Sequence, residues 1–294
     1  MIVRAKKKLT VKKKNRSFRD ILSVIFALVA ICALFYPIVA NTLVSNKTAD
    51  IVTKFNEKTS TLDKNEINHL LTSAKEYNTY IYDMSQHIPY TKSKPNYNQM
   101  LNIDNSGMMG NVSIPQIKVE NVPVYHGDSE ETLAVGIGHI PQTSLPIGGN
   151  NTHTVLSAHS GRVNNTLFTN LDKLKIGDVF YVDTLNLKMK YKINKIKVVD
   201  PEDVSTLGIQ KGKDIATLVT CYPTGVNSQR LLVTGERVPY TSKTAQEEIQ
   251  RDKYGYDFWV LLGSLILAIL AVLYLIYKYY EKRKNRSKNT EETR

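Results

Sequence analysis

The strongest candidate for chemistry in the sequence is a single thiol, Cys221, within the run Thr217–Pro223. Residues 215–220 are apolar and β-branched and stop at a Pro-Thr-Gly turn, which predicts a short buried strand that ends at Cys221. A second strand is predicted to start at Arg230, and a hairpin of this length would return Arg230 to the side of Cys221. A guanidinium beside a thiol favours the thiolate, which is the nucleophilic form of cysteine.

A cysteine nucleophile needs a proton acceptor, and spacing alone does not choose among the histidines of this chain. His159 has the best local setting, because it follows the predicted strand Thr154–Ala158 and should stand at a strand end, as Cys221 does. We expect His69, on a polar helical face, and His153, among Asn and Thr, to be solvated surface residues. The remaining histidines are His87, His126 and His139.

The sequence predicts neither a metal site nor a cofactor. It contains no Cys-x-x-Cys, His-Glu-x-x-His or acidic calcium-loop motif, and it lacks a phosphate-binding glycine motif. The absence of a Gly-x-Ser-x-Gly motif argues against a serine hydrolase. On spacing alone, Cys221 could also be an inert buried cysteine.

The net charge of +12 lies entirely in the two ends of the chain. Residues 1–20 carry nine Lys or Arg against one Asp, and residues 278–294 carry seven against three Glu. Residues 21–277 therefore contain equal numbers of basic and acidic side chains. A nucleic-acid-binding domain should have its basic excess on the folded part, so nucleic acid is not an expected partner.

Two uncharged apolar runs, residues 21–40 and 258–277, have the length of a transmembrane helix. Basic residues crowd the outer flank of each run, so the positive-inside rule places both termini in the cytoplasm and residues 41–256 outside the cell membrane. The first run exceeds the core of a cleavable signal peptide and is predicted to be a retained anchor. Because Cys32 lies in this run, Cys221 is the sole thiol of the outer part and has no internal disulfide partner.

The expected organisation follows from these features. The predicted segments are a basic cytoplasmic tail (1–20), a transmembrane signal anchor (21–40), a helical segment with a lid-like loop (41–106), a strand-rich domain (107–239), a stalk (240–257), a transmembrane helix (258–277) and a second basic tail (278–294).

The middle of the chain changes from helical to strand-like patterning. A capping box at Asp63–Glu66 and an apolar stripe after it predict an amphipathic helix that packs on the following domain, whereas residues 83–106 lose periodicity and predict a long loop. Short helical turns are expected at Glu130–Val135 and Leu167–Leu174. Strands, which suggest a closed barrel or a sandwich, are predicted at Asn111–Ile114, Ile117–Val124, Thr154–Ala158, Val179–Asp183, Leu187–Val199, Ile215–Thr220 and Arg230–Val238.

Three motifs in this order resemble the signature of the sortases of Gram-positive bacteria, most closely the class C, or pilin-polymerising, group. They are Leu-Ser-Ala-His-Ser-Gly around His159, Thr-Leu-Val-Thr-Cys ending at Cys221, and Asn-Ser-Gln-Arg-Leu-Leu-Val around Arg230. The similarity covers residues 107–238, and a membrane span after the catalytic domain also resembles class C. The resemblance implies a mainly β fold: a closed eight-stranded barrel with N-terminal helices, flanked by two transmembrane helices.

The resemblance also implies a cysteine transpeptidase. Cys221 would attack the Thr–Gly carbonyl of an LPXTG-like sorting signal, Arg230 would steady the oxyanion or position the substrate, and His159 would transfer protons to and from the two amines. The partners would be pilin subunits and other sorting-signal proteins, with a pilin lysine as acceptor. The alternatives are an enzyme that anchors proteins to a peptidoglycan precursor, a hydrolytic cysteine peptidase, and a non-catalytic assembly factor.

The sequence departs from class C in the lid. Class C enzymes usually carry an Asp-Pro-aromatic triplet in the loop before the barrel, and the nearest match here is Ile88-Pro89-Tyr90. Pro89 and Tyr90 are therefore the candidate lid residues. They would keep an aromatic plug over the thiol but lose the acidic partner of the arginine, so the lid should hold less tightly.

Overall fold

The computed structural model describes residues 47–161 and 167–241 and, nearer the two ends, single positions and short stretches within 22–43 and 262–281. Among these residues, none of the helices combines the length and the apolar character needed to span a bilayer. Most of residues 21–40 and 258–277 lie outside the described part, so both transmembrane spans stay predictions.

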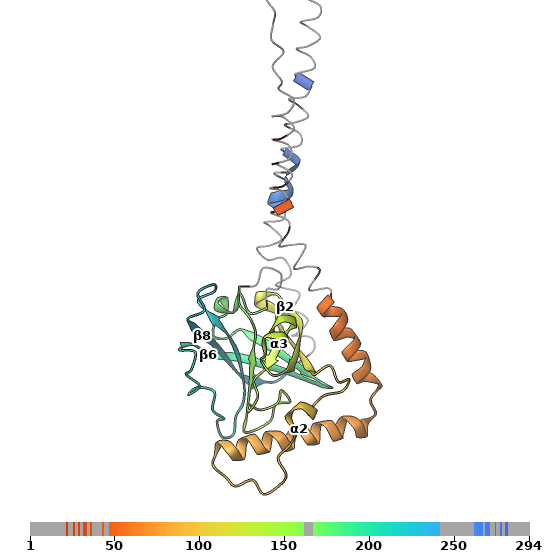
Figure 1. Cartoon of the computed structure of the whole chain (residues 1–294), viewed down its shortest axis with the longest axis vertical. Helices are drawn as coiled ribbons and strands as arrows, with labels where there is room; N and C mark the ends of the chain where they lie inside the picture. The colour runs from red at the N-terminus through yellow and green to blue at the C-terminus, as the bar shows by residue number, and fades with distance from the viewer. Residues whose placement is uncertain are drawn as a thin grey trace, which may run out of the picture.

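Eight strands close into a barrel in the order β1-β2-β3-β4-β7-β8-β6-β5, which confirms the closed eight-stranded fold (Figure 1). The pairs β2–β3 and β4–β7 are parallel, and the other neighbours are antiparallel. The strands are β1 (Met108–Ile114), β2 (Val119–His126), β3 (Ile137–His139), β4 (Thr152–Ser157), β5 (Val179–Thr184), β6 (Leu187–Val199), β7 (Asp214–Tyr222) and β8 (Gln229–Val238).

Side chains alternate between the inside and the outside of the barrel wall, as the two-residue period of a strand requires. On β7, Ala216 and Leu218 belong to the interior core, whereas Val219 packs in a separate cluster with Val155 and Leu232. This second cluster lies on the outer face of β4, β7 and β8. The outer face is therefore also apolar, and other parts of the chain cover it.

Two helical segments precede the barrel. Residues 47–61 are helical, and α2 (Lys64–Ser85) follows. The predicted capping box is present: the backbone N–H of Glu66 donates to Asp63 Oδ1 at 2.8 Å, and Asp63 N–H donates to Glu66 Oε2 at 2.8 Å. The shorter elements are η1 (Tyr97–Gln99), η2 (Pro115–Ile117), α3 (Glu130–Val135) and η3 (Leu171–Lys173).

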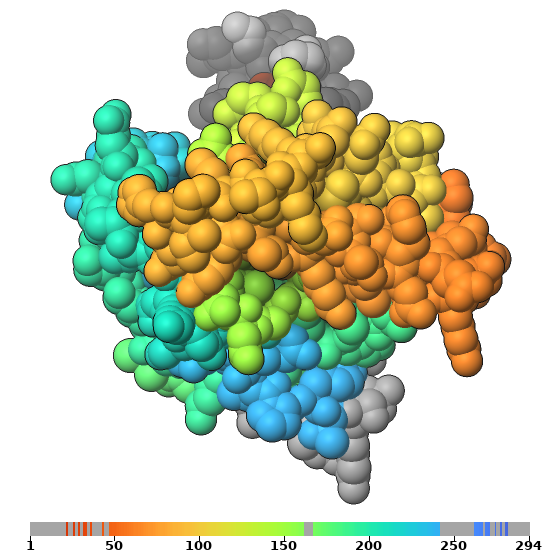
Figure 2. All heavy atoms as spheres, turned by 90° about the horizontal axis from the view of Figure 1, so that it is seen from below, coloured from red at the N-terminus to blue at the C-terminus, as the bar shows by residue number. Residues whose placement is uncertain are grey.

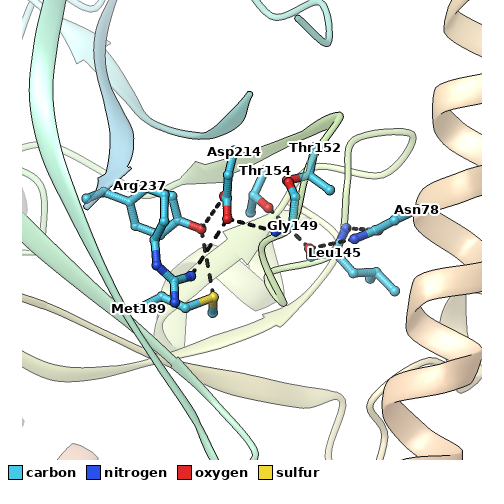
Figure 3. Close-up of polar contacts among 9 residues, drawn as sticks. Asn78, Leu145, Gly149, Thr152, Thr154, Met189, Asp214 and Arg237 are labelled. Atoms are coloured by element: carbon cyan, nitrogen blue, oxygen red, sulfur yellow. Dashed lines mark hydrogen bonds and ion pairs between the residues drawn. The ribbon is translucent and has the colours of Figure 1, made fainter. Parts of the chain in front are cut away.

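The α2 helix lies beneath the barrel and, seen from below, crosses it (Figures 1 and 2). Its apolar stripe packs against Met109 of β1 and against Leu145 in the connection between β3 and β4, which confirms that this helix packs on the following domain. Asn78 is buried in the same contact. Its Nδ2 donates to the Leu145 carbonyl at 3.3 Å, and its Oδ1 accepts from the Leu145 N–H at 2.7 Å (Figure 3).

The β3–β4 connection is tied to the barrel on its other side by Asp214, the first residue of β7 (Figure 3). Asp214 Oδ2 accepts from the Gly149 N–H at 2.7 Å, and Oδ1 accepts from the Tyr191 hydroxyl at 2.9 Å. Arg237 Nη1 lies 3.8 Å from the same carboxylate. The connection is thus held between α2 and the start of β7.

Several predictions about local structure needed correction. The three-residue strand β3 was not predicted, because a run as short as Ile137–His139 has no periodicity to detect. The turn predicted at Leu167–Leu174 is helical only over Leu171–Lys173. The predicted loop 83–106 is shorter, since α2 extends through Ser85, and it is not featureless.

Tyr97 explains how that loop is ordered. Its ring stacks on His139 with centroids 5.7 Å apart and meets His126 edge-on at 5.0 Å. Its hydroxyl lies 2.9 Å from His139 Nδ1 and accepts from the Gly127 N–H at 2.9 Å. His139 Nε2 lies 2.9 Å from the Ser144 carbonyl, so this network assigns the ring proton to Nε2.

We expect Asn78→Ala to lower the free energy of unfolding by about 2 kcal/mol, because the buried Leu145 N–H then has no partner. Urea unfolding measures the change. The matched control is Asn68→Ala, on the exposed face of the same helix, which should cost less than about 0.5 kcal/mol. Equal effects of the two substitutions would contradict the role given to Asn78.

Burial lowers the pKa of His139 to about 4, below the value of about 6.5 in an unfolded chain. Between these values the unfolded state binds a proton that the folded state does not, so the stability falls as the pH drops from 7 to 4. Burial lowers the pKa of His126 and His153 too, and these add to the same trend.

His139→Gln should therefore flatten the loss of stability between pH 7 and pH 4, by at most about 3 kcal/mol over that range. Urea midpoints at pH 7, 6 and 5 give the slope. His69→Gln changes an exposed histidine of α2 and serves as the control. If the slope of stability against pH is unchanged in His139→Gln, the buried His139 is not a cause of the loss of stability at low pH.

Candidate active site

Cys221 and Arg230 lie directly opposite each other in the β7–β8 hairpin. The antiparallel register also pairs Thr220 with Leu231 and Tyr222 with Gln229, so the predicted hairpin is present. The Cys221 thiol is free and half-buried. A thiol and a guanidinium are thereby placed at the turn end of two neighbouring strands.

His159 comes from the segment that continues β4 beside β7. The parallel register of these strands pairs Ser157 with Val219, and continuing it by two residues aligns His159 with Cys221. Hydrogen bonds extend the pairing past the end of β4: the Ala158 N–H donates to the Val219 carbonyl at 3.1 Å, and Ser160 Oγ donates to the Cys221 carbonyl at 2.8 Å.

The three residues share the outer face of the barrel. Leu156, Ala158 and Leu231 belong to the interior core. Successive side chains along a strand point to opposite faces, so the residues next to these three point outward. By alternation, Cys221 lies on the side of Val219, and Arg230 lies on that of Leu232. The side chain of His159 is 19% exposed. The thiol and the imidazole are therefore both partly exposed on the outer wall.

Arg230 is directed partly toward the hairpin turn. Its Nη1 donates to the Gln229 carbonyl at 3.0 Å and to the Asn227 carbonyl at 3.3 Å. These contacts use one of the guanidinium nitrogens, and the planar fork of an arginine presents five N–H donors in all. The turn thus fixes the side chain while the group keeps the capacity to bind an oxyanion.

Glu130, in the first turn of α3, contacts His159 and was not predicted as part of the site. Its Oε2 lies 3.4 Å from His159 Nε2, and its side chain is 79% exposed. The N-cap residue Ser129, whose Oγ accepts from the Thr132 N–H, positions this turn. Only the tertiary structure brings the two side chains together, and their sequence separation gives no signal.

The other histidines have structural surroundings. The expectation that His153 is solvated was wrong: it is 1% exposed, with Nδ1 3.0 Å from the Gly208 carbonyl and Nε2 2.7 Å from Thr217 Oγ1. His139 is fully buried in its network with Tyr97. His69 is exposed as predicted.

The candidate lid residues lie along α2. The Tyr90 ring meets the ring of Tyr80 edge-on, with centroids 5.0 Å apart, and Pro89 is exposed. A lid role for Pro89 and Tyr90 stays a prediction. Among the described residues there is no group of three or more His, Cys, Asp or Glu that could hold a metal ion.

We expect Ser160→Ala to slow alkylation of Cys221 by iodoacetamide at least threefold, because the segment that carries His159 loses a tie to β7. The free energy of unfolding should fall by no more than about 1 kcal/mol. Peptide mass spectrometry follows Cys221 separately from Cys32. Ser60→Ala, which removes a similar bond from Ser60 Oγ to the Glu57 carbonyl, is the control and should leave the rate unchanged. Equal alkylation rates in Ser160→Ala and Ser60→Ala would contradict the role given to the hydrogen bond from Ser160 to Cys221.

Comparison with known proteins gives concordant matches. The family described as the sortase domain matches residues 112–238. The crystal structure of sortase C1 from Streptococcus agalactiae is 41% identical, with a TM-score of 0.60, and the match covers 65% of this chain and 100% of that chain. A sortase C from Clostridium perfringens, solved with the C-terminal cell wall sorting motif, is also 41% identical, with a TM-score of 0.58 and the same coverage.

A curated relative gives a shorter match. Sortase D of Bacillus subtilis is 32% identical over 132 residues, which are 44% of this chain and 63% of the relative. The chain therefore matches a little under two thirds of the length of this relative.

Proposed function

We propose that this chain, which belongs to the sortase family, is a cysteine transpeptidase that cuts an LPXTG-like sorting signal between Thr and Gly and joins the acyl part to an amine. One observation carries the proposal: Cys221 and Arg230 are cross-strand partners at the edge where Ser160 ties the His159 segment to β7. It supports a site in which a nucleophile, a cation and a proton carrier surround one point on the outer wall.

In the first half-reaction, the Cys221 thiolate adds to the carbonyl carbon of the threonine. Arg230 N–H groups would stabilise the oxyanion that forms. The C–N bond then breaks, the leaving amine takes a proton from the His159 imidazolium, and a thioester remains on Cys221.

In the second half-reaction, an incoming amine attacks the thioester. Its proton passes to neutral His159, the C–S bond breaks, and the thiolate is restored together with the imidazolium. Glu130 Oε2, 3.4 Å from Nε2, would orient the imidazole in both half-reactions.

For the acceptor we propose a lysine amine of a pilin subunit, so that successive reactions polymerise the subunits. The similarity to class C sortases over the whole length of those solved chains supports this choice. A peptidoglycan-stem amine is the alternative acceptor. Water is a third possible acceptor, which would make the enzyme a hydrolytic peptidase. The Glu130–His159 contact would supply the acidic partner that the histidine of such a peptidase needs.

We further propose that the enzyme is held at the cell membrane by residues 21–40 and 258–277, with both termini in the cytoplasm and the barrel outside. The basic tails and the neutral middle of the chain support this topology. Attachment at the membrane would suit substrates that are themselves held there.

Detection of a thioacyl adduct on Cys221 tests the proposed transpeptidase function. Full-length protein incubated with an LPXTG-like peptide and N-acetyl-lysine amide should form a mass adduct on Cys221 and an amide product. Cys221→Ala should abolish the adduct and lower turnover at least about a thousandfold, as loss of a covalent nucleophile does. Cys32→Ala is the matched control and should retain both.

Turnover that persists in Cys221→Ala would contradict the proposal that Cys221 is the nucleophile. A product that gains water in place of the added amine would identify a hydrolase. An unmodified Cys221 and an uncleaved peptide would favour the non-catalytic assembly factor.

A further inference from the structure

The three residues of the candidate centre do not account for the binding of a charged acceptor. With an unperturbed pKa of about 10.4, roughly one lysine amine in a few thousand is uncharged at neutral pH, so a lysine acceptor arrives as an ammonium. Once Cys221 is acylated, neither the thioester nor Arg230 attracts a cation. A site for this acceptor therefore needs an anionic group near the thioester.

The order of the elements around the barrel places such a group on one side of the centre. β4 lies between β3 and β7, and β8 follows β7. His159, on the continuation of β4, is aligned with Cys221 of β7, and Arg230 of β8 lies beyond Cys221. On the other side of His159, Glu130 of α3 contacts the imidazole. The wall therefore carries an anion at one end of this row and a cation at the other.

The helix α3, which carries Glu130, is packed on the outer face of the barrel (Figure 1). Gly138 of β3 is paired with Ser157 of β4, which points outward because the residues on both sides of it belong to the interior core. A Cβ at Gly138 would lie 3.1 Å from Leu133 Cδ2 of α3 and would collide with the Gly127 carbonyl. The close approach at Gly138 thus fixes the place of Glu130 beside the wall.

The Glu130 side chain combines a contact with the imidazole and access to solvent. Its Oε2 lies 3.4 Å from His159 Nε2, and the side chain is 79% exposed. An ionised carboxylate has about four lone-pair positions, so contact with His159 does not exhaust its capacity to accept hydrogen bonds. An alkylammonium has three donors and forms charge-assisted hydrogen bonds with carboxylates.

We propose that Glu130 binds the ammonium group of the acceptor and holds it beside His159, on the side of Cys221 opposite Arg230. The inference rests on the proposed transpeptidase function. It makes Glu130 the residue that selects a cationic, lysine-type acceptor, whereas Arg230 serves the oxyanion of the donor.

The protons balance when the acceptor enters as an ammonium. The bound ammonium loses one proton to solvent water at this exposed edge, and the free amine attacks the thioester carbonyl carbon. A second proton passes from the amine to neutral His159 as the C–S bond breaks. The leaving amine of the first half-reaction, which took one proton from His159, takes up another from water after it departs.

The experiment measures the choice between a charged and an uncharged acceptor. Full-length protein receives an LPXTG-like donor peptide with either N-acetyl-lysine amide, which is cationic at neutral pH, or hydroxylamine, which is uncharged. Glu130→Gln removes the charge but keeps an oxygen that can contact the imidazole. We expect kcat/KM for the lysine amide, relative to that for hydroxylamine, to fall about fivefold, mainly through KM, as for loss of an exposed ion pair.

Glu131→Gln is the matched control, because it removes the same charge from the next residue of α3, which is also exposed. The ratio of the two acceptors should change less than twofold in this variant. If Glu130 only orients His159, both acceptors should slow alike in Glu130→Gln. An unchanged ratio in that variant, or an equal fall in Glu131→Gln, would overturn the inference.

Failure of the proposed function looks different, because no donor would then acylate Cys221. Methanethiosulfonates test the inference in that case, since they form a disulfide with Cys221 and release methanesulfinate without any donor. The rate with the cationic aminoethyl reagent, relative to the uncharged methyl reagent, should fall at least threefold in Glu130→Gln, and an unchanged ratio of rates refutes the inference. Peptide mass spectrometry follows Cys221 separately from Cys32.

Discussion

The parallel pairing of β4 with β7 is the contact on which the candidate centre depends. It aligns chain segments that lie 62 residues apart, and side-chain bonds continue it beyond the strand, with Thr220 Oγ1 donating to the Ala158 carbonyl at 2.7 Å. Cys221 and Arg230 are neighbours through a local hairpin, whereas His159 reaches them only through this pairing. Loosening the β4–β7 pairing would separate His159 from Cys221 and leave the Cys221–Arg230 pair in place.

The surroundings of the β4–β7 pairing explain why its geometry is well defined. The interior core packs against one side of β4 and β7, and the cluster around Val155 and Val219 packs against the other. The start of β7 is also fixed, because Asp214 binds the β3–β4 connection that α2 holds through Asn78. The N-terminal helix therefore contributes to the geometry of a centre that it does not touch, by fixing the connection that leads into β4.

Sequence patterns predicted the parts of this molecule that depend on local or periodic signals. The strand β6 and the helix α3 have the predicted bounds, and the capping box at Asp63 is formed. The strand β3 and the burial of His153 could not be predicted in this way, because both depend on tertiary partners. His153 is flanked by polar residues in the sequence, yet Thr217 and the Gly208 carbonyl bind it inside the fold. The Glu130–His159 contact has the same origin.

Closure of the eight described strands into a barrel has a consequence for recognition. In an open sheet, an extended peptide can add itself as one more strand, and main-chain hydrogen bonds then give affinity with little regard to sequence. Here every strand already has a neighbour on both sides. A polypeptide substrate of the kind proposed would therefore be recognised by side chains on the outer wall and by the connections around it. Specificity in this fold can change through those connections while the wall that carries the thiol stays the same.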